Sequence, residues 1–200
     1  MLNLDFAKSS LRAPALERGA VRLRAPQLSD YEAWRALREE SRAHLTRWEP
    51  DWTKKDVEIE AFRTRLRLQE KLFRAAVALS FFVCLKDGGR LVGGVTLSDI
   101  RRQAAQSAVI GYWIGAPFLR RGHGGDAVAA VVDYAIRDGG LNRIEAACQP
   151  GNSASLGLLQ KLGFKEEGFA RDYLHINGAW RDHLLFSLIA RDYCGAPPAI

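Results

Sequence analysis

The chain has 200 residues, 48% of them hydrophobic, which suits one domain with a sizeable core. No run approaches the roughly 18 consecutive apolar residues of a membrane span, so no membrane partner is expected. The first ten residues lack a basic-then-apolar signal pattern, which predicts a cytoplasmic protein. A formal charge of +6, from 29 Lys and Arg against 23 Asp and Glu, favours an anionic partner. It does not choose between a phosphorylated ligand, a nucleic acid and an acidic protein.

Three cysteines, Cys84, Cys148 and Cys194, show no metal-type spacing. The first two lie in apolar, strand-like runs, where buried thiols are common. We therefore expect reduced thiols and no metal site.

The chain reads as a single domain over residues 1–200, with a loose N-terminal arm over 1–18 and a tail over 195–200. Residues 20–24 alternate between apolar and polar, as a strand does. Ser29 or Asp30 then caps a helix, and Asp56 caps a longer one. One face of the longer helix is expected to carry Ile59, Phe62, Leu66, Gln69 and Phe73.

The rest of the chain alternates between strand-like and helix-like stretches. Lys86–Arg90 is typical of a hairpin turn, and Asn177-Gly178 predicts a type I′ turn. The order β-α-α-β-β-β-α-β-α-β-β predicts an α/β protein with a mixed sheet and helices on both faces. Strands are expected at Val77–Leu85, Leu91–Leu97, Ser107–Ile114, Arg143–Cys148, Phe169–Ile176 and Trp180–Ile189, and helices from Gly124 or Gly125 and over Ser153–Leu162.

The stretch between the strand at 107–114 and the next helix carries the clearest chemical signal. It contains Arg120 and Arg121 followed by Gly122, His123, Gly124 and Gly125. The start of a helix exposes unpaired N–H groups and a partial positive charge, and both attract phosphate. Glycine lets a pyrophosphate approach the backbone, and arginine adds charge-assisted hydrogen bonds. The alternative is a plain strand-to-helix turn with surface arginines.

The residues after this turn narrow the identity of the phosphate ligand. Gly122-x-Gly124-x-x-Ala127 satisfies the loose dinucleotide fingerprint. That fold needs an acidic residue at the end of the next strand, but Glu145 lies near its start. A P-loop is excluded because no Lys followed by Ser or Thr comes after the glycines. Dinucleotide binding is therefore the weaker interpretation.

About thirty residues after the turn comes Asn152-Ser153-Ala154-Ser155, followed by a helix that ends in Lys161-Leu162-Gly163-Phe164. Together with the glycine-rich turn, this pattern is similar to the acetyl-CoA site of the GNAT superfamily. Further stretches resemble the RimJ and RimL ribosomal-protein-alanine acetyltransferases: Leu45–Pro50, Gly111–Gly115, Glu167–Tyr173 and Ile176–His183. The resemblance spans roughly residues 20–190 and implies a GNAT-like, mostly antiparallel mixed sheet.

The resemblance also implies roles for individual residues. Backbone groups of Tyr112, Trp113 and Ile114 should pair with the pantetheine arm of acetyl-CoA, and the N–H groups from Arg120 to Gly125 should hold its pyrophosphate. Asn152 should bind the pantetheine or the acetyl end, although an asparagine here can equally be a helix cap.

Catalysis of acetyl transfer needs an oxyanion donor, a proton for the departing thiolate and a neutral amine. The oxyanion donor is assigned to the N–H of Trp113 or Ile114. Ser155 is the candidate proton donor, unless it is a serine that faces solvent. No general base is evident, and Glu49 and Asp172 are the candidates. The alternative role for Asp172 is to form an ion pair with Arg181.

An α-amino group titrates near ~7.8 and a lysine near ~10.4, so a site with a weak base suits a protein N-terminus better. The expected reaction is acetylation of a protein N-terminus, such as that of a ribosomal protein, with a possible weak contact to RNA or the ribosome. Two alternatives stay open. One is acetylation of a small amine, and the other is a CoA-binding or ribosome-docking module with little catalysis.

Overall fold

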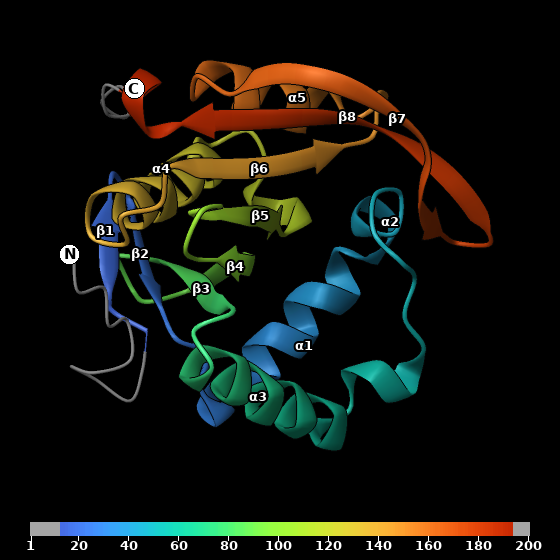
Figure 1. Cartoon of the computed structure of the whole chain (residues 1–200). Helices are drawn as coiled ribbons and strands as arrows, with labels where there is room; N and C mark the ends of the chain where they lie inside the picture. The colour runs from blue at the N-terminus through green and yellow to red at the C-terminus, as the bar shows by residue number, and fades with distance from the viewer. Residues whose placement is uncertain (1–12, 194–200) are drawn as a thin grey trace.

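The computed structural model describes residues 13–193, which form an eight-stranded sheet in the order β1-β2-β3-β4-β5-β6-β8-β7 (Figure 1). Neighbouring strands are antiparallel except for β5 and β6. The strands are β1 (Leu16–Arg18), β2 (Val21–Arg24), β3 (Leu79–Leu85), β4 (Leu91–Arg101), β5 (Ser107–Ile114), β6 (Arg143–Cys148), β7 (Lys165–Ile176) and β8 (Ala179–Ile189). The predicted mixed, mostly antiparallel sheet is confirmed.

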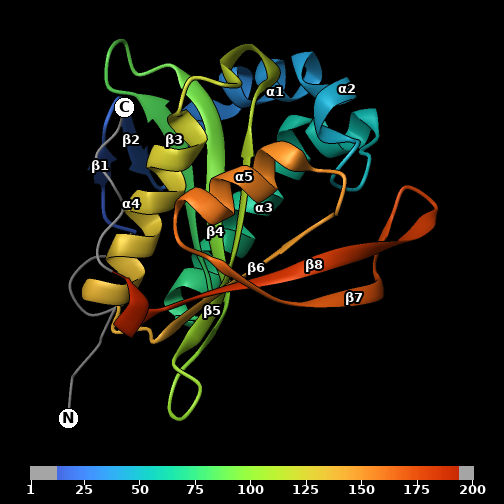
Figure 2. The same ribbon diagram turned by 90° about the horizontal axis from the view of Figure 1, so that it is seen from above.

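Helices cover both faces of this sheet, also as predicted. The helices are α1 (Tyr31–Glu40), α2 (Arg42–Leu45), α3 (Ile59–Arg74), α4 (His123–Arg137) and α5 (Ser153–Lys161), with single 3-10 turns η1 (Leu28–Asp30), η2 (Lys54–Val57), η3 (Ala116–Phe118) and η4 (Ala190–Asp192). Figure 2 shows α4 and α5 in front of β4 and β5, with α3 behind them. The apolar stripe of α3 is confirmed, since Phe62 and Phe73 are buried. None of the described helices is long and apolar enough to cross a membrane.

Three local expectations need correction. Leu16–Arg18 pair with β2, so the expected loose arm is a strand in its last part. The carboxylate of Asp30 does not cap α1, because it binds Arg24 at 2.8 and 2.5 Å and the N–H of Gln27 at 2.7 Å. Asp56 binds Thr53 at the start of η2, and α3 begins only after Glu58. Residues 1–12, the tail over 195–200 and Cys194 lie outside the described residues.

The parallel strands β5 and β6 separate after a short contact. Only three residue pairs join them, from Ser107 with Arg143 to Val109 with Glu145. Beyond that point β5 stays paired with β4, while β6 pairs with β8 as far as Cys148. The last five residues of β5 therefore have an open edge on the β6 side.

The β7–β8 hairpin extends farther than the other strands of the sheet. Its turn residues Asn177 and Gly178 have φ values of 52° and 79°, as the predicted type I′ turn requires. Figure 1 shows the hairpin running past the end of β6 and curving towards α2. The C-terminal part of the chain is thereby brought beside a segment near residue 50.

Ser41, between α1 and α2, ties these helices to the end of β5. Its side chain is fully buried, and its Oγ accepts a hydrogen bond from Ala116 N–H at 2.8 Å. Replacing Ser41 with Ala leaves this N–H unpaired, so we expect the free energy of unfolding to fall by about 1–3 kcal/mol. Urea denaturation measures the change, with the exposed Ser29→Ala as control. Equal losses in both variants would contradict the role of this bond.

Candidate active site

A cleft with a volume of about 460 Å³ opens where β5 and β6 separate. It is lined by three groups of residues: one from α2 and the loop after it, one from β5 to the start of α4, and one from the start of α5. These are His44, Leu45, Trp48 and Glu49; Tyr112–Ile114 and Phe118–Gly125; and Asn152, Ala154, Ser155 and Leu158. All but one of the residues expected at the site, including Ser155 and Glu49, meet in this cleft.

The glycine-rich turn forms one end of the cleft. Arg120 and Gly122 both have positive φ values, 61° and 81°, so the chain reverses sharply before α4 begins at His123. Gly122 is the N-cap residue and has no side chain to satisfy the first N–H groups of α4. These donors and the two exposed arginines face the cleft, as an anion site requires.

The glycines of this turn differ in what surrounds them. A Cβ on Gly124 would lie 3.3 Å from both Ile114 Cγ1 and Leu158 Cδ1, so this glycine allows α4 to pack closely. A Cβ on Gly125 would meet no atom within 4 Å. Gly125 therefore borders space that no other part of the protein fills, where a ligand can approach the start of α4.

His123 contributes its backbone to the start of α4 while its ring is buried. Burial, together with the charge of Arg121, lowers the pKa of His123 below its usual value. The imidazole is therefore neutral at pH 7, and the positive charge of the turn comes from the arginines and the helix N-terminus.

The backbone of β5 faces two ways. Gly115 N–H donates to Val92 O of β4 at 2.9 Å. Since backbone groups alternate along a strand, those of Trp113 also point to β4, and those of Tyr112 and Ile114 point into the opening. This corrects the expectation for Trp113: of the two candidate oxyanion donors, only Ile114 has its N–H on the cleft side.

The side chains of β5 alternate as well, and they divide the cleft. Tyr112 reaches α5, and Ile114 lies against the start of α4. Trp113 points to the opposite face, where its ring lies 5.2 Å from the guanidinium carbon of Arg38 on α1. Gly94 makes room for this indole, because a Cβ there would lie 2.7 Å from Trp113 Nε1.

On the α5 face, three side chains form a connected group. Asn152 Oδ1 accepts from Ser155 N–H at 3.1 Å, so Asn152 is a helix cap and its amide nitrogen remains available as a donor. Ser155 Oγ lies 2.7 Å from the hydroxyl of Tyr112. Burial raises the pKa of Tyr112 to about 12. Ser155 thus faces the cleft, not solvent, beside a phenol that stays protonated.

On the opposite face, Glu49 belongs to a cluster of aromatic and charged groups. Its Oε1 lies 2.6 Å from Arg38 Nη1, an ion pair whose angles are not those of a hydrogen bond. Arg38 in turn stacks 3.9 Å from the ring centre of Trp52. Arg38 Nε, Glu49 Oε1 and Trp52 Nε1 are buried and have no hydrogen-bond partner among residues 13–193. Buried polar atoms normally have partners, so this cluster has unused capacity for a polar ligand.

Asp172 is placed elsewhere. It is exposed in an irregular part of β7, with a φ of 47°. Its N–H donates to Asp182 Oδ1 at 2.9 Å, and within the described chain its carboxylate makes no ion pair with Arg181. It does not line the cleft. The structure therefore separates Asp172 from Glu49 and Ser155.

Three groups in or beside the cleft were not found from the sequence. Tyr112 was named for its backbone alone, although its hydroxyl reaches Ser155. His44 lines the cleft, and burial lowers its pKa, which favours the neutral imidazole. Gln149 Nε2 donates to Trp48 O at 3.4 Å. Only the tertiary fold brings these residues together, and no local motif marks them.

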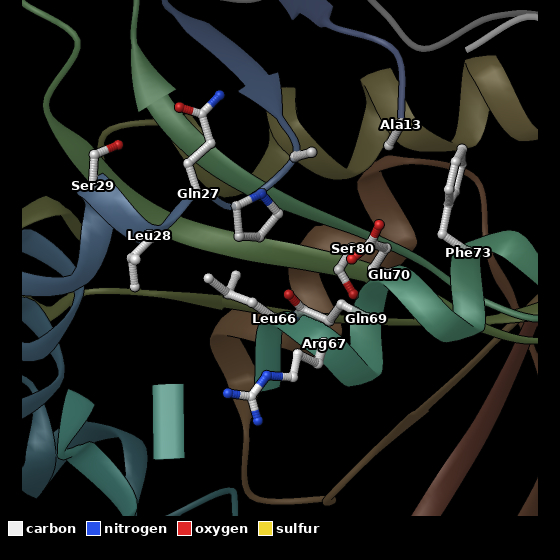
Figure 3. Close-up of a pocket in the computed structure, with 12 residues that line it drawn as sticks. Ala13, Gln27, Leu28, Ser29, Leu66, Arg67, Gln69, Glu70, Phe73 and Ser80 are labelled. Carbon is white, nitrogen blue, oxygen red and sulfur yellow. The ribbon is translucent and has the colours of Figure 1, made fainter. Parts of the chain in front are cut away.

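A second cavity of about 480 Å³ lies between α3 and the segment after β2 (Figure 3). It is bounded at one side by Ala13, the first described residue, and shares no lining residue with the cleft. Over residues 13–193, no group of three or more His, Cys, Asp or Glu side chains could hold a metal ion.

Comparison with known proteins agrees with this geometry. Residues 20–165 match the family described as "Acetyltransferase (GNAT) domain". The chain is 32% identical over 166 residues to the "[Ribosomal protein uS5]-alanine N-acetyltransferase" of Escherichia coli (strain K12), covering 82% of this chain and 86% of the relative.

Two solved structures are similar over most of their length. One is RimJ of Mycobacterium smegmatis in complex with CoA-disulfide, with a TM-score of 0.85, 32% identity and coverage of 92% of this chain and 89% of that one. The other is the ribosomal-protein-S5-alanine acetyltransferase of Vibrio fischeri, with a TM-score of 0.83, 32% identity and coverage of 90% and 98%. On the strength of these matches, the chain belongs to the GNAT acetyltransferase family and is an acetyl-CoA-dependent N-acetyltransferase.

Proposed function

We propose that this enzyme acetylates the N-terminal α-amino group of a protein, such as a ribosomal protein, in the cytoplasm. The observation that carries the proposal is the division of the cleft by β5. Groups suited to a thiol lie on one face, and a carboxylate suited to an amine lies on the other. The relatives named for ribosomal-protein acetylation support the choice of acceptor.

The turn from Arg120 to Gly125 is assigned to the pyrophosphate of acetyl-CoA. Its free N–H groups, the N-terminus of α4 and two arginines supply positive potential at one point. The open edge of β5 then receives the pantetheine arm, with Tyr112 and Ile114 presenting backbone groups to it. Ile114 N–H is the assigned donor to the oxyanion that forms during acetyl transfer.

Ser155 is assigned as the donor to the departing thiolate. Its hydroxyl lies in the cleft and bonds to the hydroxyl of Tyr112. When Ser155 turns its proton towards the sulfur, Tyr112 can supply the hydrogen bond that the serine oxygen then accepts. Tyr112 is therefore a positioning residue, which orients the hydroxyl of Ser155.

The acceptor amine is assigned to the face that carries Glu49. The carboxylate attracts an ammonium group, and neutral His44 nearby is able to take up a proton. Arg38 neutralises much of the charge of Glu49, so the site has no strong base. An amine that is already partly neutral at pH 7 suits such a site. An α-amino group with a pKa near ~7.8 meets this condition, and a lysine near ~10.4 does not.

The assigned role of Gly125 predicts a selective loss of coenzyme A binding. A Cβ there meets no protein atom, so Gly125→Ala should leave the fold intact. It would occupy the space of the phosphate and raise the Kd at least about tenfold, the equivalent of one charge-assisted hydrogen bond. Isothermal calorimetry gives the Kd, with Gly157→Ala on α5 as control, because its Cβ also meets nothing. An unchanged Kd in both variants would reject the assignment.

The pairing of Tyr112 with Ser155 predicts effects that do not add. Ser155→Ala should lower kcat roughly 10- to 100-fold, as expected when a proton donor is lost. Tyr112→Phe should lower kcat by a smaller factor, and the double variant should be no slower than Ser155→Ala. Release of free thiol from acetyl-CoA measures each rate. Independent, multiplicative losses would show that the tyrosine does not act through the serine.

The choice of acceptor predicts a preference for a free N-terminus. Two peptides of identical sequence with one internal lysine, one with a free and one with a blocked N-terminus, are compared by mass spectrometry. Acetylation of the N-terminus in the free peptide should be more than about 100-fold faster than acetylation of the lysine in the blocked peptide, because lysine is almost fully protonated at pH 7. The proposal would be contradicted if the lysine were acetylated faster than the N-terminus. It would also be contradicted if small amines were acetylated faster than both peptides.

A further inference from the structure

The tip of the β7–β8 hairpin contacts a loop far away in the sequence. Asn177, the first residue of the turn, accepts a hydrogen bond from Asp51 N–H through its Oδ1 at 2.6 Å. Its Nδ2 donates to Thr46 O at 2.6 Å and to Glu49 O at 3.3 Å. One side-chain amide therefore binds three backbone groups of the loop over residues 46–51.

This loop carries the wall of the cleft that is assigned to the acceptor. It supplies Trp48 and Glu49 to the cleft. A second contact from the same half of the sheet comes from Gln149, whose Nε2 donates to Trp48 O at 3.4 Å. The backbone of the loop is thus tied to the strands β6 to β8, while the carboxylate of Glu49 is paired with Arg38 of α1. The position of Glu49 depends on both connections.

The turn itself does not require the amide of Asn177. A φ of 52° lies in the left-handed region, which glycine adopts without a steric cost, and Gly-Gly forms type I′ turns as Asn-Gly does. What glycine lacks are the three bonds to the loop. The asparagine amide therefore has a function separate from the shape of the hairpin.

We propose that Asn177 is a positioning residue for the acceptor amine. Its amide fixes the loop over residues 46–51, so that Glu49 and Trp48 stay at the side of β5 from which the amine approaches. The inference rests on the proposed function, which assigns the face of β5 with Glu49 to the acceptor amine. Asn177 does not itself line the cleft, so its effect would act through the loop.

Hydrogen exchange of the full-length enzyme tests the contact without any acceptor. In Asn177→Gly, the amide of Asp51 loses its acceptor, so exchange over residues 46–51 should rise at least about tenfold. Asn177→Asp keeps an oxygen for Asp51 N–H but loses both donors, so an intermediate increase is expected. Asn142→Gly, an exposed asparagine outside the cleft, is the matched control and should leave this loop unchanged. Unchanged exchange in Asn177→Gly would overturn the proposal.

Steady-state kinetics test the consequence, with whichever acceptor the wild-type enzyme acetylates fastest. Asn177→Gly should raise the acceptor KM about tenfold while kcat falls less than about threefold and the Kd of acetyl-CoA stays the same. Increased exchange with an unchanged KM would show that the contact is structural only and would overturn the positioning role. If the fastest acceptor is a small amine, the proposed protein acceptor fails, while the role of Asn177 is still decided by these two measurements.

Discussion

The short ladder between β5 and β6 is the constraint on which the rest of the structure depends. The two strands are parallel and exchange only three residue pairs before β6 leaves to follow β8. Backbone N–H and C=O groups that are left unpaired in a protein interior are costly. The open edge of β5 therefore presents backbone groups to the cleft, and under the proposed function the amide groups of the extended pantetheine arm pair with them.

Charged side chains surround the last residue of β6 that pairs with β5. Glu145, at the last paired position of β6, accepts hydrogen bonds from Arg143 at 2.8 Å and from Arg101 at 2.7 Å, and Arg143 also pairs with Glu167. The pKa of Glu167 is lowered to about 2, chiefly by its hydrogen bond with Arg143. Glu145 thus pairs with arginines of the sheet, which agrees with dinucleotide binding being the weaker interpretation of the sequence.

Strand alternation explains how one short segment serves two substrates. Along β5, successive side chains point to opposite faces, so Tyr112 meets Ser155 and Trp113 meets Arg38. The N–H of Ile114, the next residue along β5, points into the cleft and is the one proposed to donate to the oxyanion. Under the proposed function, the chemistry of the thiol and that of the amine are thus kept on separate faces of a single strand. Loops supply the rest of the acceptor wall, and hydrogen bonds from Gln149 and Asn177 hold them in place.

The sequence by itself determined the order of elements apart from β1 and α2, and it indicated the turn that is proposed to bind phosphate. The boundaries of β5 and β6 agree with those predicted, and the type I′ turn at Asn177-Gly178 is present. Both follow from local physics: strand propensity and glycine conformations act within a few residues. The same holds for the turn before α4, where Gly122 needs a positive φ. The motifs with Asn152 and Ser155 were also visible, because a helix start has a sequence signature.

Only the tertiary structure decided what meets across the sheet. Glu49 and Asp172 were equal candidates in the sequence, yet the fold brings Glu49 into the cleft and leaves Asp172 exposed on β7. Leu16–Arg18 form a strand because they pair with the edge of β2. Asp30, expected as a helix cap, pairs with Arg24 instead. Which backbone groups of β5 face the cofactor was set by its register with β4. These contacts join residues that are far apart in the chain, so a local sequence pattern cannot predict them.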